Sequence, residues 1–123
     1  MHDRYSITDL CLDLDGTVYR DGIIFPGIES KLNELVRNGI AIWYITNNTS
    51  KSHIEYLSKL SSLGLPVRPK GLVTPIDVFN TSVRCDKQTY VLGCEEVASE
   101  VKNNVSDLID AEQILVTFDK TLN

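Results

Sequence analysis

The sequence predicts an α/β protein with a Rossmann-like, mostly parallel sheet. Three observations lead to this fold class. Strand-like and helix-like segments alternate along the chain, residues 40–46 (IAIWYIT) are apolar at nearly every position, and polar residues cluster where the first two strands end. Continuous apolar strands are typical of parallel sheets that are covered on both faces. Right-handed crossovers then bring the carboxyl ends of the strands to one edge, where ligands bind in folds of this kind.

The first elements follow from local patterns. Residues 10–14 (LCLDL) form the first predicted strand, and Asp21-Gly22 between two β-prone triplets predicts a tight hairpin with positive φ at its centre. Apolar residues over 28–36 recur at i, i+4, i+7 and i+8, which predicts a helix that stops at Gly39.

The central elements are marked by capping signals. Ser52 and Glu55 have the spacing of a capping box, so a second helix should open there and stop near Gly64. After a short strand over residues 71–74, Thr74 and Pro75 are suited to the N-cap and first position of a third helix.

The remaining pattern repeats the alternation. The third helix should cover residues 75–84, and a strand over 89–93 should precede a helix over 95–104. The last predicted strand is 113–119 (QILVTFD), followed by a polar tail.

Composition restricts the classes of function. A chain of 123 residues with 42% hydrophobic residues can bury a real core, and no apolar run reaches membrane-spanning length. The N-terminal residues MHDRYS lack a secretory pattern, so we expect a cytoplasmic protein with no membrane partner. A net charge of -5 argues against a nucleic-acid partner. Cys11, Cys85 and Cys94 are odd in number and lack metal-site spacing, so we expect reduced thiols, with Cys11 acting as a small hydrophobe in its strand.

Two acids and a polar cluster point to one crevice. Asp13 and Asp15 close the first strand, and residues 46–48 close the second, so both sets should face the same crevice. Strand residues two apart point to one face at a separation of about 6.5–7 Å. Carboxylates that close favour a bound cation or a shared proton, and Mg²⁺ is the natural cation for oxygen ligands. One carboxylate can act as a nucleophile while the other moves a proton.

The polar cluster supplies donors for a phosphate. Thr46 offers a hydroxyl and Asn47 an amide, and the N–H groups at the helix start near Ser52 would suit phosphate oxygens. Asp-Gly is also common turn chemistry, and Thr-Asn-Asn alone is more often a cap or turn. Their occurrence at two successive strand ends favours a functional site. His53 lacks an evident partner in the sequence and is expected to be a solvated residue of the helix start.

Several motifs together resemble a known family. The segments DLDGTVYRDG, FPG, WYITNNTSKS, YLSKLSSLGLPV and LVTP are similar to those of haloacid dehalogenase-like phosphatases. The similar branch is subfamily IIA, which contains 4-nitrophenyl, phosphoglycolate and pyridoxal phosphatases and a sugar-operon phosphatase.

The resemblance implies roles for five residues. Asp13 would be the nucleophile and a Mg²⁺ ligand, and Asp15 would be the general acid/base and offer its backbone carbonyl to the metal. Thr46, Asn47 and Gly16 would form the phosphate-binding part, with Gly16 letting the chain turn sharply away from the strand.

The resemblance also implies a domain layout. Residues 1–78 would form the N-terminal part of the core, and residues 79–123 the incomplete beginning of an α/β cap domain. The C-terminal part of the core, with a lysine and an acidic metal motif, would be absent, and the spacing of Lys51 or Lys70 supports neither as a substitute. Asp119 and Lys120 resemble a loop of the cap.

The predicted function is a Mg²⁺-dependent phosphatase that acts on a small phosphorylated metabolite through an aspartyl-phosphate, or the N-terminal fragment of one. The alternative is a catalytically inactive, truncated phosphatase-like protein that binds phosphate or assembles with a partner. A receiver-like signalling domain is less favoured, because receivers carry their acceptor aspartate after the third strand. An exposed sheet edge or the cap should lead to self-association.

Overall fold

Residues 6–118 are described by the computed structural model, and they contain three sheets and the helices between them. They divide into two compact units. The first comprises the residues up to Thr46 together with Leu57–Val73, and the second comprises Asn47–Tyr56 and the residues from Thr74 onward. The alternation of strands and helices confirms the predicted α/β class.

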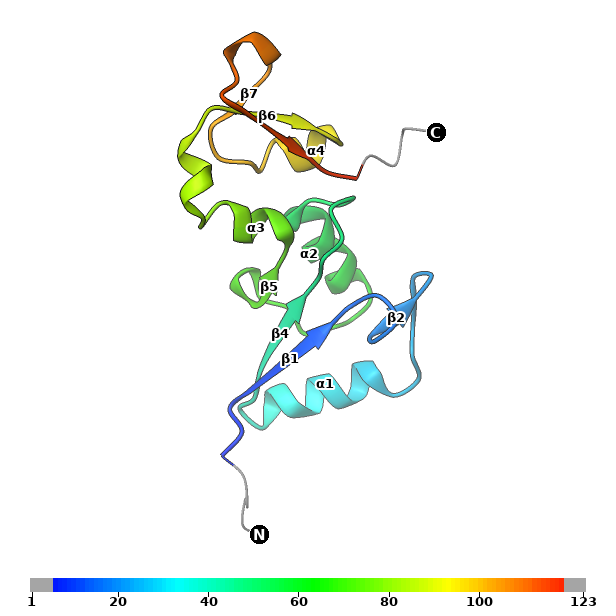
Figure 1. Ribbon diagram of the computed structural model, residues 1–123. Helices are drawn as coiled ribbons and strands as arrows, with labels where there is room; N and C mark the ends of the chain where they lie inside the picture. Colours follow the sequence, from blue (N-terminus) through cyan, green and yellow to red (C-terminus); the bar gives the residue numbers. More distant parts are fainter. Residues whose placement is uncertain (1–5, 119–123) are drawn as a thin grey trace. The chain divides into compact units, whose positions relative to one another are not determined.

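The sheet of the first unit is parallel. It contains β1 (Asp9–Asp13), β4 (Ala41–Ile45) and β5 (Leu72–Val73) in the order β1-β4-β5. The pairing of β1 with β4 runs from Asp9 opposite Ala41 to Asp13 opposite Ile45, so the two strands end together. Figure 1 shows them side by side, with α1 (Ile28–Arg37) running alongside.

The predicted hairpin is present. Strands β2 (Tyr19–Arg20) and β3 (Ile23–Ile24) pair antiparallel across Asp21 and Gly22, whose φ angles are 51° and 76°. Positive φ at both central residues is typical of the turn whose twist matches that of a β-hairpin. Helix α1 is followed by Gly39 at φ 85°, which confirms the predicted stop.

Tyrosine and leucine side chains build the core of the first unit. Tyr44 is fully buried, and its hydroxyl donates to the Pro66 carbonyl at 2.8 Å. Burial raises the pKa of Tyr44 to about 12. Helix α2 (His53–Ser62) ends before Gly64, at φ 78°. The other buried apolar residues of this unit are Leu14, Val18, Tyr19, Leu32, Ile42, Leu60, Leu65 and Leu72.

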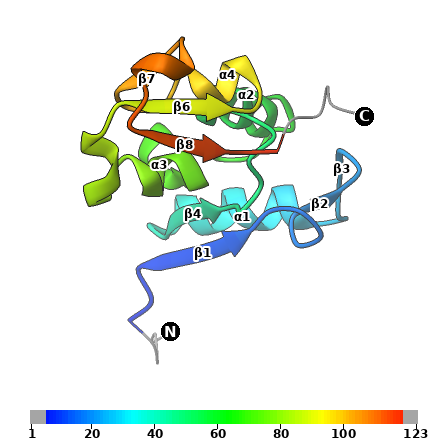
Figure 2. The ribbon, with the colours of Figure 1, turned by 45° about the horizontal axis from the view of Figure 1, so that its top comes forward.

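The second unit is also built on a parallel sheet. Its strands β6 (Thr89–Leu92), β7 (Asn104–Val105) and β8 (Gln113–Val116) lie in the order β7-β6-β8, and Figure 2 shows β6 and β8 side by side. Helices α3 (Pro75–Phe79) and α4 (Glu95–Ala98) contribute to one core. That core contains Ile76, Cys94, Val97 and Val101, packed against Phe79, Val91 and Leu115.

The helices of this unit are shorter than predicted. The expected helices over 75–84 and 95–104 end at Phe79 and Ala98, and β7 was not predicted. Asn80 ends α3 because its side chain donates to the Glu100 carbonyl at 2.7 Å and accepts from the Lys102 N–H at 2.9 Å. Such side-chain bonds compete with helix continuation. The capping prediction for α3 is confirmed, since Thr74 and the N3 residue form a capping box with Pro75 at the first position.

The three cysteines are free thiols, as expected. Cys85 and Cys94 are buried, whereas Cys11 is exposed, so the prediction that Cys11 packs as a small hydrophobe is wrong for the described chain. Cys11 shares one face of β1 with Asp9 and Asp13, and all three side chains are exposed. None of the described helices is long and apolar enough to cross a membrane. Asp119 and Lys120 lie outside the described residues.

Candidate active site

The candidate residues of the first unit lie at two adjacent strand ends. Asp13 is the last residue of β1 and pairs with Ile45, the last residue of β4. Thr46 follows directly, and its N–H donates to the Val73 carbonyl of β5 at 3.1 Å. Because parallel strands end at the same edge of a sheet, Asp13 and Thr46 share the edge at which α/β proteins bind ligands.

A tight turn carries the second acid out of the core. Leu14 is fully buried while Asp13 and Asp15 are exposed, so the alternation of exposed and buried side chains along the strand continues into the turn. Gly16 adopts φ 81°, and its N–H donates to the Tyr19 carbonyl at 2.8 Å. Glycine occupies this conformation without steric cost, so the predicted sharp turn at Gly16 is confirmed.

Both carboxylates are accessible to a ligand. Asp13 Oδ2 accepts one long hydrogen bond, from the Thr17 hydroxyl at 3.4 Å. Within the described part of the chain, no side chain donates a hydrogen bond to the Asp15 carboxylate. Sequence reasoning did not single out Thr17. Its place directly after Asp15-Gly16 in the DGT tripeptide was the available signal.

Thr46 and Asn47 differ in their surroundings. Thr46 is buried, with 6% of its surface exposed, whereas Asn47 is exposed. Thr46 belongs to the first unit and Asn47 begins the second. Their predicted joint role in phosphate binding stays a prediction.

The N-terminus of α2 is already occupied by protein oxygens. Glu55 Oε1 accepts from the Ser52 N–H at 3.0 Å, and Ser52 Oγ accepts from the Glu55 N–H at 3.1 Å, which confirms the capping box. The N–H groups of His53 and Ile54 donate to the Glu100 carboxylate at 2.6 and 3.2 Å. The expectation that these N–H groups bind a phosphate is therefore wrong.

His53 is not the isolated histidine that the sequence suggested. Its Nδ1 lies 2.8 Å from Asp77 Oδ2, and the same carboxylate oxygen accepts from the Thr74 N–H and hydroxyl at 2.8 and 2.9 Å. Sequence separation concealed this pair, because its members are 24 positions apart. The pair belongs to the second unit.

The donor set at the β1 end fits part of a magnesium site. Asp13 offers an exposed carboxylate, and the Asp15 peptide adds a carbonyl oxygen to the same turn, both of the donor type that Mg²⁺ prefers. Among residues 6–118, no group of three or more His, Cys, Asp or Glu side chains could enclose a metal ion by itself. Mg²⁺ commonly binds through one or two carboxylates plus water and substrate oxygens, so this partial set is compatible with it.

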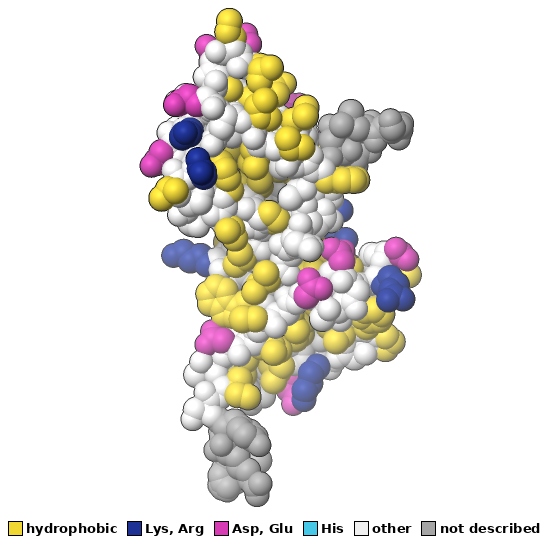
Figure 3. Space-filling view, viewed as in Figure 1, with side chains coloured by type: hydrophobic (Ala, Val, Ile, Leu, Met, Phe, Trp, Pro, Cys, Tyr) yellow, Lys and Arg dark blue, Asp and Glu magenta, His cyan; other side chains and the backbone are white. Residues whose placement is uncertain are grey.

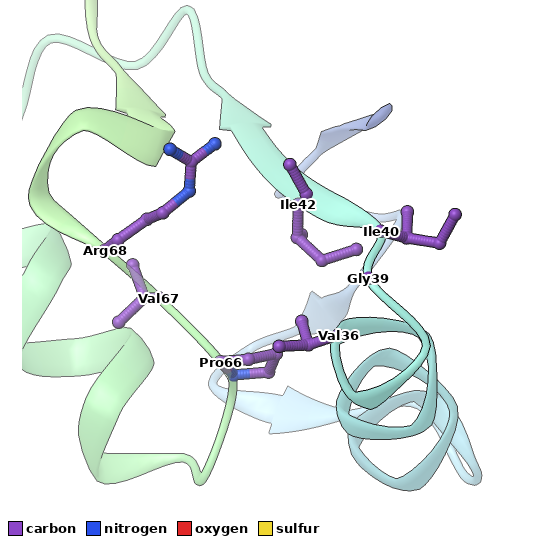
Figure 4. A pocket seen from close by; sticks show the side chains of 8 residues that line it. Val36, Gly39, Ile40, Ile42, Pro66, Val67 and Arg68 are labelled. Carbon is purple, nitrogen blue, oxygen red and sulfur yellow. The ribbon is translucent and has the colours of Figure 1, made fainter. Parts of the chain in front are cut away.

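An apolar pocket of about 400 Å³ lies at the opposite end of the first unit's sheet. It is lined by Val36 and by residues 39–42 and 66–68, and Figure 4 shows Arg68 as its charged member. Ala41 is the first residue of β4, whereas Thr46 follows the last. The pocket therefore contains none of the candidate residues.

Comparison with known families identifies the family of this chain. A family model described as haloacid dehalogenase-like hydrolase matches residues 10–105, which is most of the chain. The chain belongs to the haloacid dehalogenase-like hydrolases. This confirms the resemblance that the sequence motifs indicated, and the match includes every candidate residue of the site.

Relatives of this hydrolase are named as phosphatases. It is 31% identical over 109 residues to glycerol-3-phosphate phosphatase of Rattus norvegicus, covering 79% of this chain and 34% of the relative. A 4-nitrophenylphosphatase from Thermotoga maritima has a similar structure, with a TM-score of 0.82 and 26% identity over 95% of this chain and 47% of that one.

A glycerol phosphate phosphatase from Mycobacterium tuberculosis, solved in complex with magnesium, shares the fold. Its TM-score is 0.72 and its identity 22%, with 94% of this chain and 37% of that chain covered. The hydrolase described here spans about a third of the length of the curated relatives it matches first. The matches to phosphatases of this kind support the subfamily IIA branch and its N-terminal part.

Proposed function

We propose that this chain carries the nucleophile-bearing part of a Mg²⁺-dependent phosphatase that acts on phosphomonoesters. One observation carries the proposal, namely that the candidate residues lie at two paired strand ends. Asp13 ends β1 opposite Ile45, Thr46 directly follows Ile45, and Asp15 is exposed on the turn after β1. Membership of a hydrolase family with relatives named as phosphatases supports it.

In the proposed reaction, a carboxylate oxygen of Asp13 attacks phosphorus and forms the aspartyl-phosphate. The bond between phosphorus and the ester oxygen breaks, and the departing oxygen takes a proton from the Asp15 carboxyl. A water molecule then attacks the phosphorus and gives its proton to the Asp15 carboxylate. The bond between phosphorus and the Asp13 oxygen breaks, inorganic phosphate leaves, and both aspartates return to their starting states. Dividing the displacement in this way replaces one difficult step with two easier ones.

Donors near Asp13 would hold the phosphoryl group. In this proposal the Thr46 hydroxyl and the Asn47 amide donate to its non-bridging oxygens, where negative charge is concentrated. Gly16, at φ 81°, would contribute by turning the chain sharply away from the strand beside the nucleophile. Mg²⁺, held by the Asp13 carboxylate and the Asp15 carbonyl, would neutralise part of the phosphate charge when bound. Thr17 would orient Asp13 through its 3.4 Å hydrogen bond.

The substrate class follows from the relatives. Their names refer to glycerol-3-phosphate and 4-nitrophenyl phosphate, both small phosphomonoesters. We propose a small phosphorylated metabolite for this chain and a cytoplasmic location. We also propose that the chain self-associates through an exposed sheet edge or through the expected cap, residues 79–123.

The test is hydrolysis of 4-nitrophenyl phosphate by the purified chain with and without Mg²⁺. Asp13→Asn should lower kcat at least about hundredfold without changing the unfolding midpoint, because it removes the nucleophile. Asp9→Asn is the matched control, since Asp9 is exposed on the same face of β1. Mg²⁺-dependent turnover lost only in the Asp13 variant supports the proposal.

Two other outcomes decide against it. Equal turnover in the Asp13 variant and the wild type would exclude Asp13 as the nucleophile. A folded wild-type chain that binds inorganic phosphate without any turnover would favour the non-catalytic alternative.

A further inference from the structure

The carboxylate of Glu100 caps a helix that lies far from it in the sequence. Its Oε1 accepts from the His53 N–H at 2.6 Å and its Oε2 from the Ile54 N–H at 3.2 Å. These residues are 47 and 46 positions away along the chain, and all three belong to the second unit. Glu100 therefore binds the start of α2 with both oxygens.

Neighbouring contacts fix the backbone of Glu100. Its N–H donates to the Val97 carbonyl at 3.1 Å, and its own carbonyl accepts from Asn80 Nδ2 at 2.7 Å. Val97 is fully buried and Val101 is 2% exposed, so the residues around Glu100 belong to the core of the unit. The carboxylate thus extends from a rigid support.

Two further bonds hold the same segment. His53 Nδ1 lies 2.8 Å from Asp77 Oδ2, and Asp77 is fixed by its capping bonds at the start of α3. Thr49 Oγ1 accepts from the Phe118 N–H at 2.8 Å. The segment 49–54 is therefore attached at three points to residues that come 24 to 69 positions later.

Charge strengthens the Glu100 contact. A negative group at a helix N-terminus interacts favourably with the helix dipole and satisfies N–H groups that lack intrahelical partners. Hydrogen bonds to an ionised acceptor are also stronger than those between neutral groups.

We infer that Glu100 is a positioning residue for the loop 47–52. This loop carries Asn47 and leads directly into α2, and the bond from the Ser50 N–H to Asn48 Oδ1, at 2.8 Å, closes a turn within it. Fixing the start of α2 therefore restrains the end of the loop that joins it. The inference rests on the proposed function in one respect, the role of Asn47 as a phosphate donor.

Backbone NMR of the full chain tests the positioning without any substrate. In Glu100→Ala, the amides of His53 and Ile54 should exchange at least about tenfold faster, and the amide shifts of residues 47–49 should change. Glu100→Gln keeps the side-chain length and one acceptor oxygen, so it should give smaller effects. It replaces the alanine variant in this test if that variant fails to fold. Glu96→Ala is the matched control, since Glu96 is exposed on the nearby helix α4.

Kinetics with 4-nitrophenyl phosphate supply the second readout. Loss of the Glu100 contact at the start of α2 should raise KM about three- to tenfold and lower kcat by a smaller factor, because it weakens phosphate binding. Unchanged shifts at 47–49 in Glu100→Ala, or a kcat that falls while KM stays constant, would overturn the inference. Absence of turnover in the wild type refutes the proposed function instead, and the NMR result still decides the role of Glu100.

Discussion

The turn between β6 and α4 allows a quantitative prediction, because Gly93 and Thr117 are in contact there. A Cβ added at Gly93 would lie 1.8 Å from Thr117 Oγ1 and 3.2 Å from its Cβ, whereas ordinary contacts begin at 3.4 Å. Thr117 is 9% exposed and its N–H is bonded to the Leu92 carbonyl at 2.9 Å, so it has little room to withdraw. We expect Gly93→Ala to lower the free energy of unfolding by about 1–3 kcal/mol.

Thr117→Ala isolates the cause. The Thr117 hydroxyl is buried without a hydrogen-bond partner among the described residues, so its removal relieves an unsatisfied group. We expect this single variant to stay within about 1 kcal/mol of the wild type, since one methyl group is lost as well. In the double variant the 1.8 Å contact is gone and the 3.2 Å contact remains, so most of the lost stability should return.

Urea unfolding of the four proteins measures the coupling. The double-mutant cycle should give an interaction energy of at least about 1 kcal/mol, with equal m-values in all four. Strictly additive effects would refute the reasoning, because the cost of Gly93→Ala would then have a source other than Thr117. The cycle tests the packing of the sheet that supports Glu100.

Two remaining predictions concern pH and association. Burial raises the pKa of Tyr44 from 10.0 to about 12, so the folded state keeps the phenol proton to a higher pH than the unfolded state does. The contribution of Tyr44 to the free energy of unfolding should therefore be fully present below pH 10 and be lost between pH 10 and 12. In Tyr44→Phe the urea unfolding midpoint should decrease less with rising pH over this range. An equal decrease in the wild type and the variant would contradict the prediction. Figure 3 shows hydrophobic side chains exposed at several places on one face of the molecule. Light scattering should detect self-association that Val116→Lys reduces, because Val116 lies on β8 with 68% of its surface exposed. The exposed hairpin residue Ile23, changed to Lys, is the control, and a wild-type monomer at high concentration would contradict the prediction.

Local sequence signals predicted the elements around the site correctly. The hairpin with positive φ at its centre (Asp21-Gly22), the helix stop at Gly39 and the capping box of Ser52 and Glu55 match the structure. Each signal concerns residues within about four positions of one another, where backbone geometry is determined by the residues themselves. The placement of two acids at one strand end follows in the same way from strand periodicity.

Contacts between distant segments were not predictable from those signals. Whether the N–H groups at the start of α2 stay available depends on Glu100, and whether His53 has a partner depends on Asp77. The end of α3 depends on Asn80, which bonds to residues 20 and 22 positions later. No local propensity encodes such pairs.

The sequence alone determined the family of this hydrolase, its parallel α/β pattern and the acids Asp13 and Asp15 at the end of the first strand. Only the tertiary structure decided which donors near them are already used, because a carboxylate from residue 100 takes the helix N–H groups that the sequence had assigned to phosphate. The physical reason is that a polar group's availability depends on every partner that folding brings within hydrogen-bonding distance, and the decisive partners here lie far away along the chain.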